Sequence, residues 1–224
     1  MEFREYADRD MLELGLASVL GGELTNALQQ PGDVLFVVPG GTTPAPVFDV
    51  LCAVNLEWER VTVAPTDERW VSEDSPRSNA RLIREHLLVE RAAQAKFLSL
   101  YTGAPTPEEA FGELVEKIEP LLPISVALLG MGEDMHVASL FPGCKNLASA
   151  LRDEAPDLLP MHPPGQPEAR ITLTAPVLNG ALSKHLVITG EAKRSALEKA
   201  REIGDPLQAP VLAVLDGAVV HWAA

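Results

Sequence analysis

The segment Gly40-Gly41-Thr42-Thr43-Pro44 is the first whose residue types suggest chemistry. It follows an apolar run over 34–38 and precedes a stretch, 46–54, that is expected to be helical, so it forms a strand-to-helix loop. Small residues let backbone amides approach an anion, and the two threonine hydroxyls can donate to it as well. The pattern favours a phosphate-binding loop, and a plain tight turn is the alternative.

Two further segments place reactive side chains directly after predicted strands. Asp67-Glu68-Arg69 follows the apolar run 61–64, and His136 follows the apolar run 125–129 with carboxylates nearby in the sequence. Histidine titrates near neutral pH, which suits a general base. A surface ion-pair cluster and a structural histidine are the alternatives. Structural or surface roles are predicted for the remaining histidines, which are His86, His162, His185 and His221.

Arg170 and Lys193 are candidate anion ligands. Lys and Arg number 18 against 32 Asp and Glu, so the net charge of −14 repels anions from the molecule as a whole. A phosphate site would therefore need local cations. Arg170 opens a predicted strand and Lys193 begins a predicted helix, so both could converge on the loop 40–43, although each could also be an ordinary surface cation.

Strands that alternate with helices are predicted to position these residues. Apolar runs indicate strands, whereas helical spacing and the capping residues Ser75 and Thr106 indicate helices. The predicted strands are 34–38, 61–64, 125–129, 170–174, 185–189 and 211–215, and the predicted helices are 8–29, 46–54, 77–89, 106–119 and 192–203. The order predicts a three-layer α/β fold, a mainly parallel sheet with helices on both faces, and ligands at the carboxyl ends of the strands. The proline-rich stretch 156–167 is predicted to be a loop.

Length, charge and cysteine content limit the classes of protein to consider. A chain of 224 residues is expected to form one domain, 1–224, and its acidic charge disfavours nucleic acid and anionic membranes as partners. Cys52 and Cys144 lack the spacing of a metal or redox motif, and the first residues do not resemble a signal peptide. A cytoplasmic protein with reduced thiols is expected.

Taken together and in this order, the motifs resemble the 6-phosphogluconolactonase family. The most diagnostic motif is the continuation Ala138-Ser139-Leu140-Phe141-Pro142 after His136. The other matching segments are Gly40 to Pro44, Asp67 to Arg69, Ser78-Asn79, Leu129-Gly130-Met131-Gly132, Arg170 to Thr174 and Gly190-Glu191-Ala192-Lys193. The resemblance covers about Val34 to Leu197. It implies a fold similar to glucosamine-6-phosphate deaminase and ribose-5-phosphate isomerase.

The resemblance also implies an activity, hydrolysis of 6-phospho-D-glucono-1,5-lactone, and roles for the residues. His136, Asp67 and Arg69 would lie at the lactone carbonyl, with Asp67 orienting the histidine or the arginine. The phosphate and the rest of the substrate would be held by Gly40, Gly41, Thr42, Thr43, Asn79, Arg170 and Lys193. Because a lactone is an activated ester, a base and an oxyanion donor suffice, and no metal or cofactor is expected. A monomer or weak homodimer is expected.

The sequence departs from the family beside the predicted base. The family usually has Asp-Gly-His-Thr, whereas this chain has Asp134-Met135-His136-Val137. Methionine adopts a positive φ less readily than glycine, so a loop that needs such a residue would have to be remodelled. Loss of the threonine hydroxyl also removes a potential hydrogen bond.

Two other functions fit parts of the pattern. A glucosamine-6-phosphate deaminase would share the glycine-rich loop and the histidine loop, but that family typically has an Ala-Phe-Asn-Glu-Pro continuation in place of Ala138 to Pro142. A catalytically inactive phosphosugar sensor would keep the anion loop, and Met135 and Val137 leave that reading open.

Overall fold

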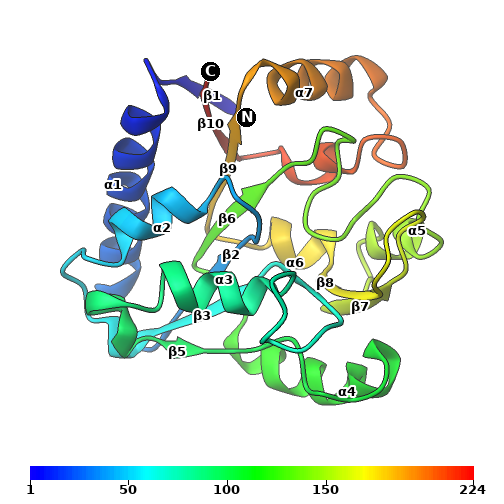
Figure 1. Cartoon of the computed structure of the whole chain (residues 1–224), viewed down its shortest axis with the longest axis horizontal. Helices are drawn as coiled ribbons and strands as arrows, with labels where there is room; N and C mark the ends of the chain where they lie inside the picture. Colours follow the sequence, from blue (N-terminus) through cyan, green and yellow to red (C-terminus); the bar gives the residue numbers. More distant parts are fainter.

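The computed structural model describes residues 1–224, and its central element is a seven-stranded sheet in which all neighbouring strands are parallel (Figure 1). The strand order is β1-β10-β9-β6-β2-β3-β5. The strands are β1 (Glu2–Glu5), β2 (Val34–Val38), β3 (Val61–Pro65), β5 (Lys96–Phe97), β6 (Val126–Gly130), β9 (Ser183–Thr189) and β10 (Val219–Ala223). The predicted strands at 34–38, 61–64, 125–129 and 185–189 are thus confirmed within one or two residues.

Strand β2 explains why its sequence is a continuous apolar run. Val34, Phe36 and Val38 contribute to the core on one face of the sheet, whereas Leu35 and Val37 contribute to the core on the other face. Both faces of a central parallel strand are covered, so neither set of alternating side chains meets water.

Helices cover both faces and complete the predicted three layers. The core on one face includes side chains from α1 (Arg9–Leu28), α2 (Ala45–Leu51) and α3 (Asn79–His86). The core on the other face includes side chains from α4 (Pro107–Ile118), α5 (Leu147–Ala150), α6 (Ala175–Asn179) and α7 (Glu191–Ile203). Short 3₁₀ helices are η1 (Trp58–Arg60), η2 (Glu90–Gln94), η3 (Glu119–Leu121) and η4 (Pro210–Val214). None of the helices has the length and apolar character needed to cross a membrane.

A second, three-stranded antiparallel sheet was not predicted. It consists of β4 (Asp67–Arg69), β8 (Arg170–Leu173) and β7 (Leu158–Met161), in that order. The predicted strand at 170–174 therefore lies outside the parallel sheet, and part of the predicted loop 156–167 is a strand. The polar residues of β4 carry no strand signal, because their pairing with β8 depends on tertiary contacts.

Two other predictions were wrong in position. The helix expected from 77 begins at Asn79, because the Ser78 hydroxyl rather than Ser75 caps it and accepts from the Arg81 amide at 3.2 Å. The segment 211–215 is not the terminal strand: it overlaps η4, and β10 follows it. Pro210 lacks an N–H for a ladder, and the apolar side chains of η4 pack on the core instead of extending the sheet.

Candidate active site

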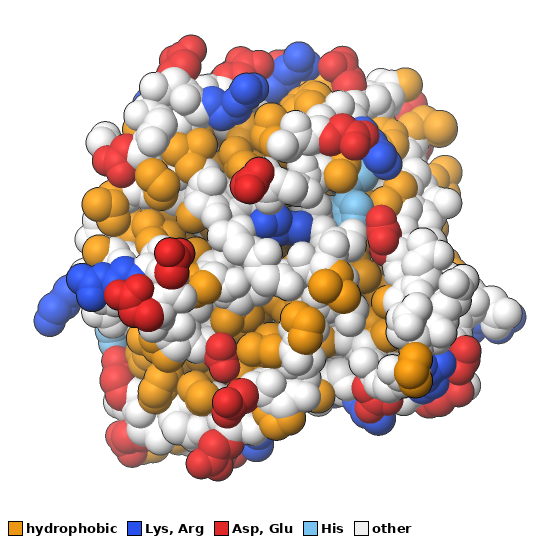
Figure 2. All heavy atoms as spheres, turned by 180° about the vertical axis from the view of Figure 1, so that it is seen from behind, with side chains coloured by type: hydrophobic (Ala, Val, Ile, Leu, Met, Phe, Trp, Pro, Cys, Tyr) orange, Lys and Arg blue, Asp and Glu red, His pale blue; other side chains and the backbone are white.

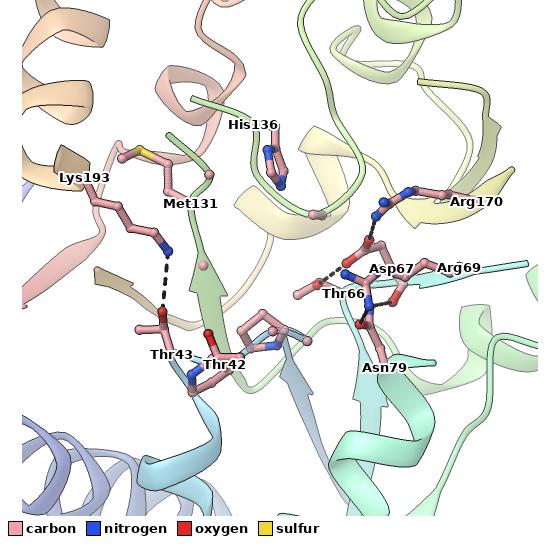
Figure 3. A pocket seen from close by; sticks show the side chains of 17 residues that line it. Thr42, Thr43, Thr66, Asp67, Arg69, Asn79, Met131, His136, Arg170 and Lys193 are labelled. Atoms are coloured by element: carbon pink, nitrogen blue, oxygen red, sulfur yellow. Dashed lines mark hydrogen bonds and ion pairs between the residues drawn. The ribbon is translucent and has the colours of Figure 1, made fainter. Parts of the chain in front are cut away.

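A cavity of about 220 Å³ lies at the carboxyl ends of the central strands (Figure 3). Loops that follow the adjacent strands β6, β2 and β3 reach it, and so does Lys193 of α7, the helix that follows β9, as expected for an open parallel sheet. The cavity brings together every residue that the sequence predicted for the site, which are Gly40, Gly41, Thr42, Thr43, Asp67, Arg69, Asn79, His136, Arg170 and Lys193.

Lys193 lies beside the glycine-rich loop, as predicted. Its Nζ is 3.4 Å from Thr43 Oγ1, and Gly41 in the same loop has a φ of 93°, a conformation that favours glycine. Burial lowers the pKa of Lys193, and the charge of Glu133 only partly opposes this shift. An anion bound next to Lys193 would restore the stability of its ammonium form.

Arg170 makes no hydrogen bond to the glycine-rich loop. It lies with Asp67 in the same cavity, at 3.7 Å from Nη1 to Oδ2, and both side chains are nearly buried, at 5% and 7% exposure (Figure 3). Burial lowers the pKa of Arg170 and the charge of Asp67 opposes the shift. Lys193 and Arg170, the two cationic side chains predicted to bind phosphate, therefore lie in different parts of one cavity.

The Asp67 carboxylate is fully engaged, but not with His136. Thr66 Oγ1 donates to Oδ1 at 2.9 Å, and the Ser139 hydroxyl donates to Oδ2, the atom that also faces Arg170. The expectation that Asp67 orients His136 or Arg69 is not met by these contacts. They make Asp67 the counter-ion of Arg170.

Arg69 is held by Asn79 and by backbone. Its Nη1 donates to Asn79 Oδ1 and to the Arg77 carbonyl, each at 2.7 Å, and Asn79 Nδ2 donates to the Asp67 carbonyl at 2.7 Å. A Cβ on Gly40 would lie 1.8 Å from Asn79 Oδ1. Gly40 is therefore needed for this contact as well as for the loop.

Glu68, between the two site residues, has a structural role. Its carboxylate is completely buried and accepts from the amides of Asn79 and Ala80, at 2.8 and 2.7 Å, where α3 begins. Burial raises the pKa of Glu68 and these backbone hydrogen bonds oppose the shift. Glu68 thus ties β4 to α3 and places Asn79 against Arg69.

Asp134 is the residue that orients His136. Its carboxylate contacts His136 Nδ1 and also accepts from the His136 amide at 3.2 Å, while the ring stacks on Phe141 with centroids 4.0 Å apart. Burial opposes ionisation of Asp134, but the contact with His136 outweighs it and lowers the pKa of that carboxyl. With Nδ1 engaged, the remaining nitrogen Nε2 is left for the cavity that the ring lines (Figure 3).

Gly132 makes room for this pair. A Cβ at position 132 would lie 2.2 Å from His136 Nδ1 and 2.5 Å from Asp134 Oδ1. The Gly132 amide donates to the His136 carbonyl at 3.0 Å, which closes the loop. The glycine is required by the close approach of the imidazole rather than by a positive φ.

Met135 keeps the left-handed backbone that its glycine counterpart would adopt easily. Its φ is 67°, its amide donates to the Gly132 carbonyl at 3.0 Å, and its carbonyl accepts from the Val211 amide at 3.0 Å. Its side chain packs against the core, and Val137 is buried. The substitution is therefore accommodated by strain and packing and does not displace His136 from the cavity.

Two buried guanidinium atoms lack a partner. The Nε atoms of Arg69 and Arg170 make no hydrogen bond, although polar groups in protein interiors are nearly always paired. Arg69 and Arg170 are opposite each other in the β4–β8 register, so both donors lie at one side of the cavity. This arrangement is suited to bind a negatively charged or strongly polarised oxygen.

Sequence reasoning missed Thr66, Asp134, Ser139 and Phe141 as supporting residues. The spacing of Asp134 and His136 was a usable signal, because a carboxylate two residues before a histidine can reach its ring within one turn. Ser139 and Asp67 are distant in sequence, and nothing local predicts their contact.

Comparisons with known proteins agree with this geometry. Residues 7–222 match the family model described as glucosamine-6-phosphate isomerases/6-phosphogluconolactonase. A 6-phosphogluconolactonase of Pseudomonas aeruginosa is 41% identical over 93% of this chain and 89% of its own length. The crystal structure of a 6-phosphogluconolactonase from Shewanella baltica has a TM-score of 0.96 and 35% identity, and the match covers 100% of this chain and 98% of that one.

A monomeric glucosamine-6-phosphate deaminase matches with a TM-score of 0.79 and 17% identity, covering 100% of this chain and 97% of that one, and shares the fold alone. The fold similarity predicted for the deaminases is thereby confirmed. The matched residues, the relatives and the cavity lead to one conclusion: the chain belongs to the glucosamine-6-phosphate isomerase/6-phosphogluconolactonase family.

Proposed function

We propose that this protein hydrolyses 6-phospho-D-glucono-1,5-lactone to 6-phospho-D-gluconate, the lactone-opening step of the oxidative pentose phosphate pathway. The observation that carries the proposal is a cavity in which an Asp134-supported histidine lies together with Arg69, Arg170 and Lys193. The named relatives of high identity and coverage are 6-phosphogluconolactonases, which supports the same substrate.

Cationic side chains in the cavity offset the repulsion of an anionic substrate by the net negative charge of the molecule. Acidic side chains are scattered over the face in Figure 2 rather than gathered in one patch. Within the cavity three cationic side chains converge, whereas Asp67 is already paired. In the proposed complex the loop 40–43 and Lys193 hold the phosphate from one side of the cavity and Arg170 holds it from the other, and Arg69, next to Arg170 in the β4–β8 register, faces the lactone carbonyl.

The proposed reaction needs one base that later acts as an acid. Neutral His136 takes a proton on Nε2 from water as the water oxygen bonds to the lactone carbonyl carbon. Arg69 stabilises the negative charge that develops on the carbonyl oxygen. When the tetrahedral intermediate collapses, the bond to the ring oxygen breaks and His136 returns the proton to that oxygen. Asp134 holds Nδ1 throughout and stabilises the imidazolium form.

No step of this scheme needs a metal ion or cofactor, so we propose catalysis that is insensitive to chelators. The proposal extends to a single domain, 1–224, that is cytoplasmic and monomeric or weakly dimeric. Its partner would be the phosphosugar lactone, and nucleic acid and membranes are disfavoured by the net charge of −14.

The test is acid release from freshly generated 6-phosphoglucono-1,5-lactone in the presence of EDTA, compared with the spontaneous rate. We expect the protein to accelerate hydrolysis and to release no ammonia from glucosamine 6-phosphate. Ammonia release without lactonase activity would identify a deaminase. Binding of 6-phosphogluconate without either activity would identify a sensor.

A further inference from the structure

Two segments next to the cavity are joined by an ion pair that the proposed chemistry does not use. Residues 70–78 connect β4 to α3, and residues 162–169 connect β7 to β8. Arg77 of the first segment and Glu168 of the second form an ion pair, with Nη2 and Oε2 2.8 Å apart. The Trp70 amide also donates to the Ala169 carbonyl at 2.8 Å. We call the Arg77–Glu168 pair the latch.

The first segment supports Arg69. The Arg77 carbonyl accepts a 2.7 Å hydrogen bond from Arg69 Nη1, so the same residue holds Arg69 through its backbone and Glu168 through its side chain. Arg69 Nε has no partner, and where that donor points depends on how the rest of the guanidinium is held.

The second segment supports Arg170 in a parallel way. Glu168 precedes Arg170 by two residues, and Gln166 Oε1 accepts from Arg170 Nη2 at 3.2 Å. The Nε of Arg170 is also without a partner. Each unpaired donor in the cavity therefore belongs to an arginine held by one of the two latched segments.

One partner of the latch, Glu168, is largely buried, so the ion pair differs from one that is exposed on both sides. The Glu168 side chain is 14% exposed and that of Arg77 is 47% exposed. The hydrogen bond from Arg77 lowers the pKa of Glu168, and the charge of Arg170 acts in the same direction. Glu168 is thus a carboxylate that lies near the cation of Arg77 in the first segment and near that of Arg170 in β8.

We propose that Arg77 and Glu168 are positioning residues whose ion pair fixes the spacing of the Arg69 and Arg170 guanidinium groups, and thereby the affinity of the cavity for an anionic phosphosugar. The inference rests on the proposed function, because it takes these two arginines as ligands of the substrate. Because Arg69 is also the proposed donor to the oxyanion, it predicts weaker binding together with a lower kcat.

The test uses the full chain and two readouts. The affinity for 6-phosphogluconate is measured by calorimetry, and kcat and KM are measured with the lactone, for wild type, Arg77→Gln, Glu168→Gln and the charge-reversed double variant Arg77→Glu/Glu168→Arg. The control is Arg84→Gln, which removes an ion pair between α3 and Glu73 of the first segment; its arginine is about as exposed as Arg77, at 51%, and its glutamate is more exposed than Glu168, at 31%.

We expect each single latch variant to weaken 6-phosphogluconate binding and raise KM about two- to fivefold, equivalent to roughly 0.4–1 kcal/mol, and to lower kcat by up to about fivefold through Arg69. The double variant should recover part of the loss, and Arg84→Gln should bind like wild type. Unchanged affinity in both single variants, or an equal loss in Arg84→Gln, would overturn the latch. Wild type that binds 6-phosphogluconate but hydrolyses no lactone would refute the proposed function and leave the binding test of the latch intact.

Discussion

His136 and the pair His185 and His221 show how differently one residue type can be used in this chain. His136 lies in a polar cavity against the carboxylate of Asp134. His185 and His221 lie inside the sheet layer, where their rings hydrogen-bond to each other at 3.0 Å and to the hydroxyls of Ser183 and Tyr6 at 3.0 and 2.8 Å.

The partners decide what each ring can do. Burial lowers the pKa of His185 to about 4, with a smaller contribution from Arg4. Burial and then the charge of His185 lower the pKa of His221 to about 3. These two rings stay neutral and satisfy each other's hydrogen bonds, whereas the carboxylate beside His136 stabilises the imidazolium that a general base must form. A histidine in a folded chain is identified by its neighbours, not by its burial alone.

Among changes to the neighbours of these histidines, the largest effect is expected from Asp134→Asn. The amide cannot stabilise the imidazolium form of His136 and can favour the wrong tautomer, so kcat should fall roughly tenfold to a hundredfold. Steady-state kinetics with the lactone measures it, with the thermal midpoint as a check on folding. A kcat equal to wild type would show that Asp134 does not support the base.

A somewhat smaller loss of kcat is expected from Gly132→Ala, which displaces the His136 ring but leaves Asp134 in place. In Gly132→Ala the added Cβ would collide with the imidazole, so kcat should fall about tenfold while the free energy of unfolding changes by less than about 1 kcal/mol. Gly112→Ala, on α4 with no atom within 4 Å of the added Cβ, is the matched control. Full activity of the Gly132 variant would mean that the loop absorbs the methyl group.

The buried pair, His185 and His221, should affect the stability of the protein at acid pH and not its activity. Below pH 6.5 these two histidines become protonated in the unfolded chain but stay neutral in the folded one. Their contribution to the free energy of unfolding is therefore fully present above pH 6.5 and is lost as the pH falls toward 4 and 3. When the pH is lowered from 6.5 to 4.5, the titration of each ring should lower the free energy of unfolding by on the order of 2 kcal/mol. Urea unfolding at both pH values measures this.

His221→Gln removes one titrating ring and keeps side-chain atoms able to hydrogen-bond to Tyr6 and His185. Its stability should depend less on pH than that of wild type in this range. His162→Gln is the control, because His162 is exposed and pairs with Glu108. Equal pH dependence in all three proteins would refute the proton linkage assigned to the buried pair.

The smallest effect concerns the strained residue beside the base. Met135→Gly and Met135→Ala both lose the packed thioether, but only alanine keeps a Cβ at a positive φ. The glycine variant should therefore be more stable than the alanine variant by about 1 kcal/mol, the reverse of their usual order. Parallel urea titrations measure the difference. If alanine were the more stable, the left-handed backbone at 135 would not be strained in solution.

Much of the fold followed from local sequence, and the exceptions have physical causes. Apolar runs such as 34–38 predicted the parallel strands because both faces of those strands are buried. The antiparallel sheet was missed because β4 is polar and its partner β8 lies far along the chain. The run 211–215 was misassigned because a short apolar segment has no period that separates a strand from a 3₁₀ turn.

The site followed the same rule. The loop 40–43, the segment 67–69 and His136 were predicted because they follow strands at their carboxyl ends, where the topology collects them. Arg170 and Lys193 were predicted as the local cations that an anion site in an acidic chain needs, and Asn79 was implied by the family resemblance. Their pairing could not be predicted. The pairing of β4 with β8 brings Asp67 into contact with Arg170 and Ser139. The closure of the loop after β6 brings Asp134 into contact with His136.

The most direct test of the account compares wild type with His136→Ala in a pH-stat assay of 6-phosphoglucono-1,5-lactone at neutral pH with EDTA, after subtraction of the spontaneous rate. We predict that wild type accelerates hydrolysis and that the variant loses about 10² to 10⁴ in kcat while it still binds 6-phosphogluconate. A variant with the wild-type rate would contradict the assignment of His136 as the base.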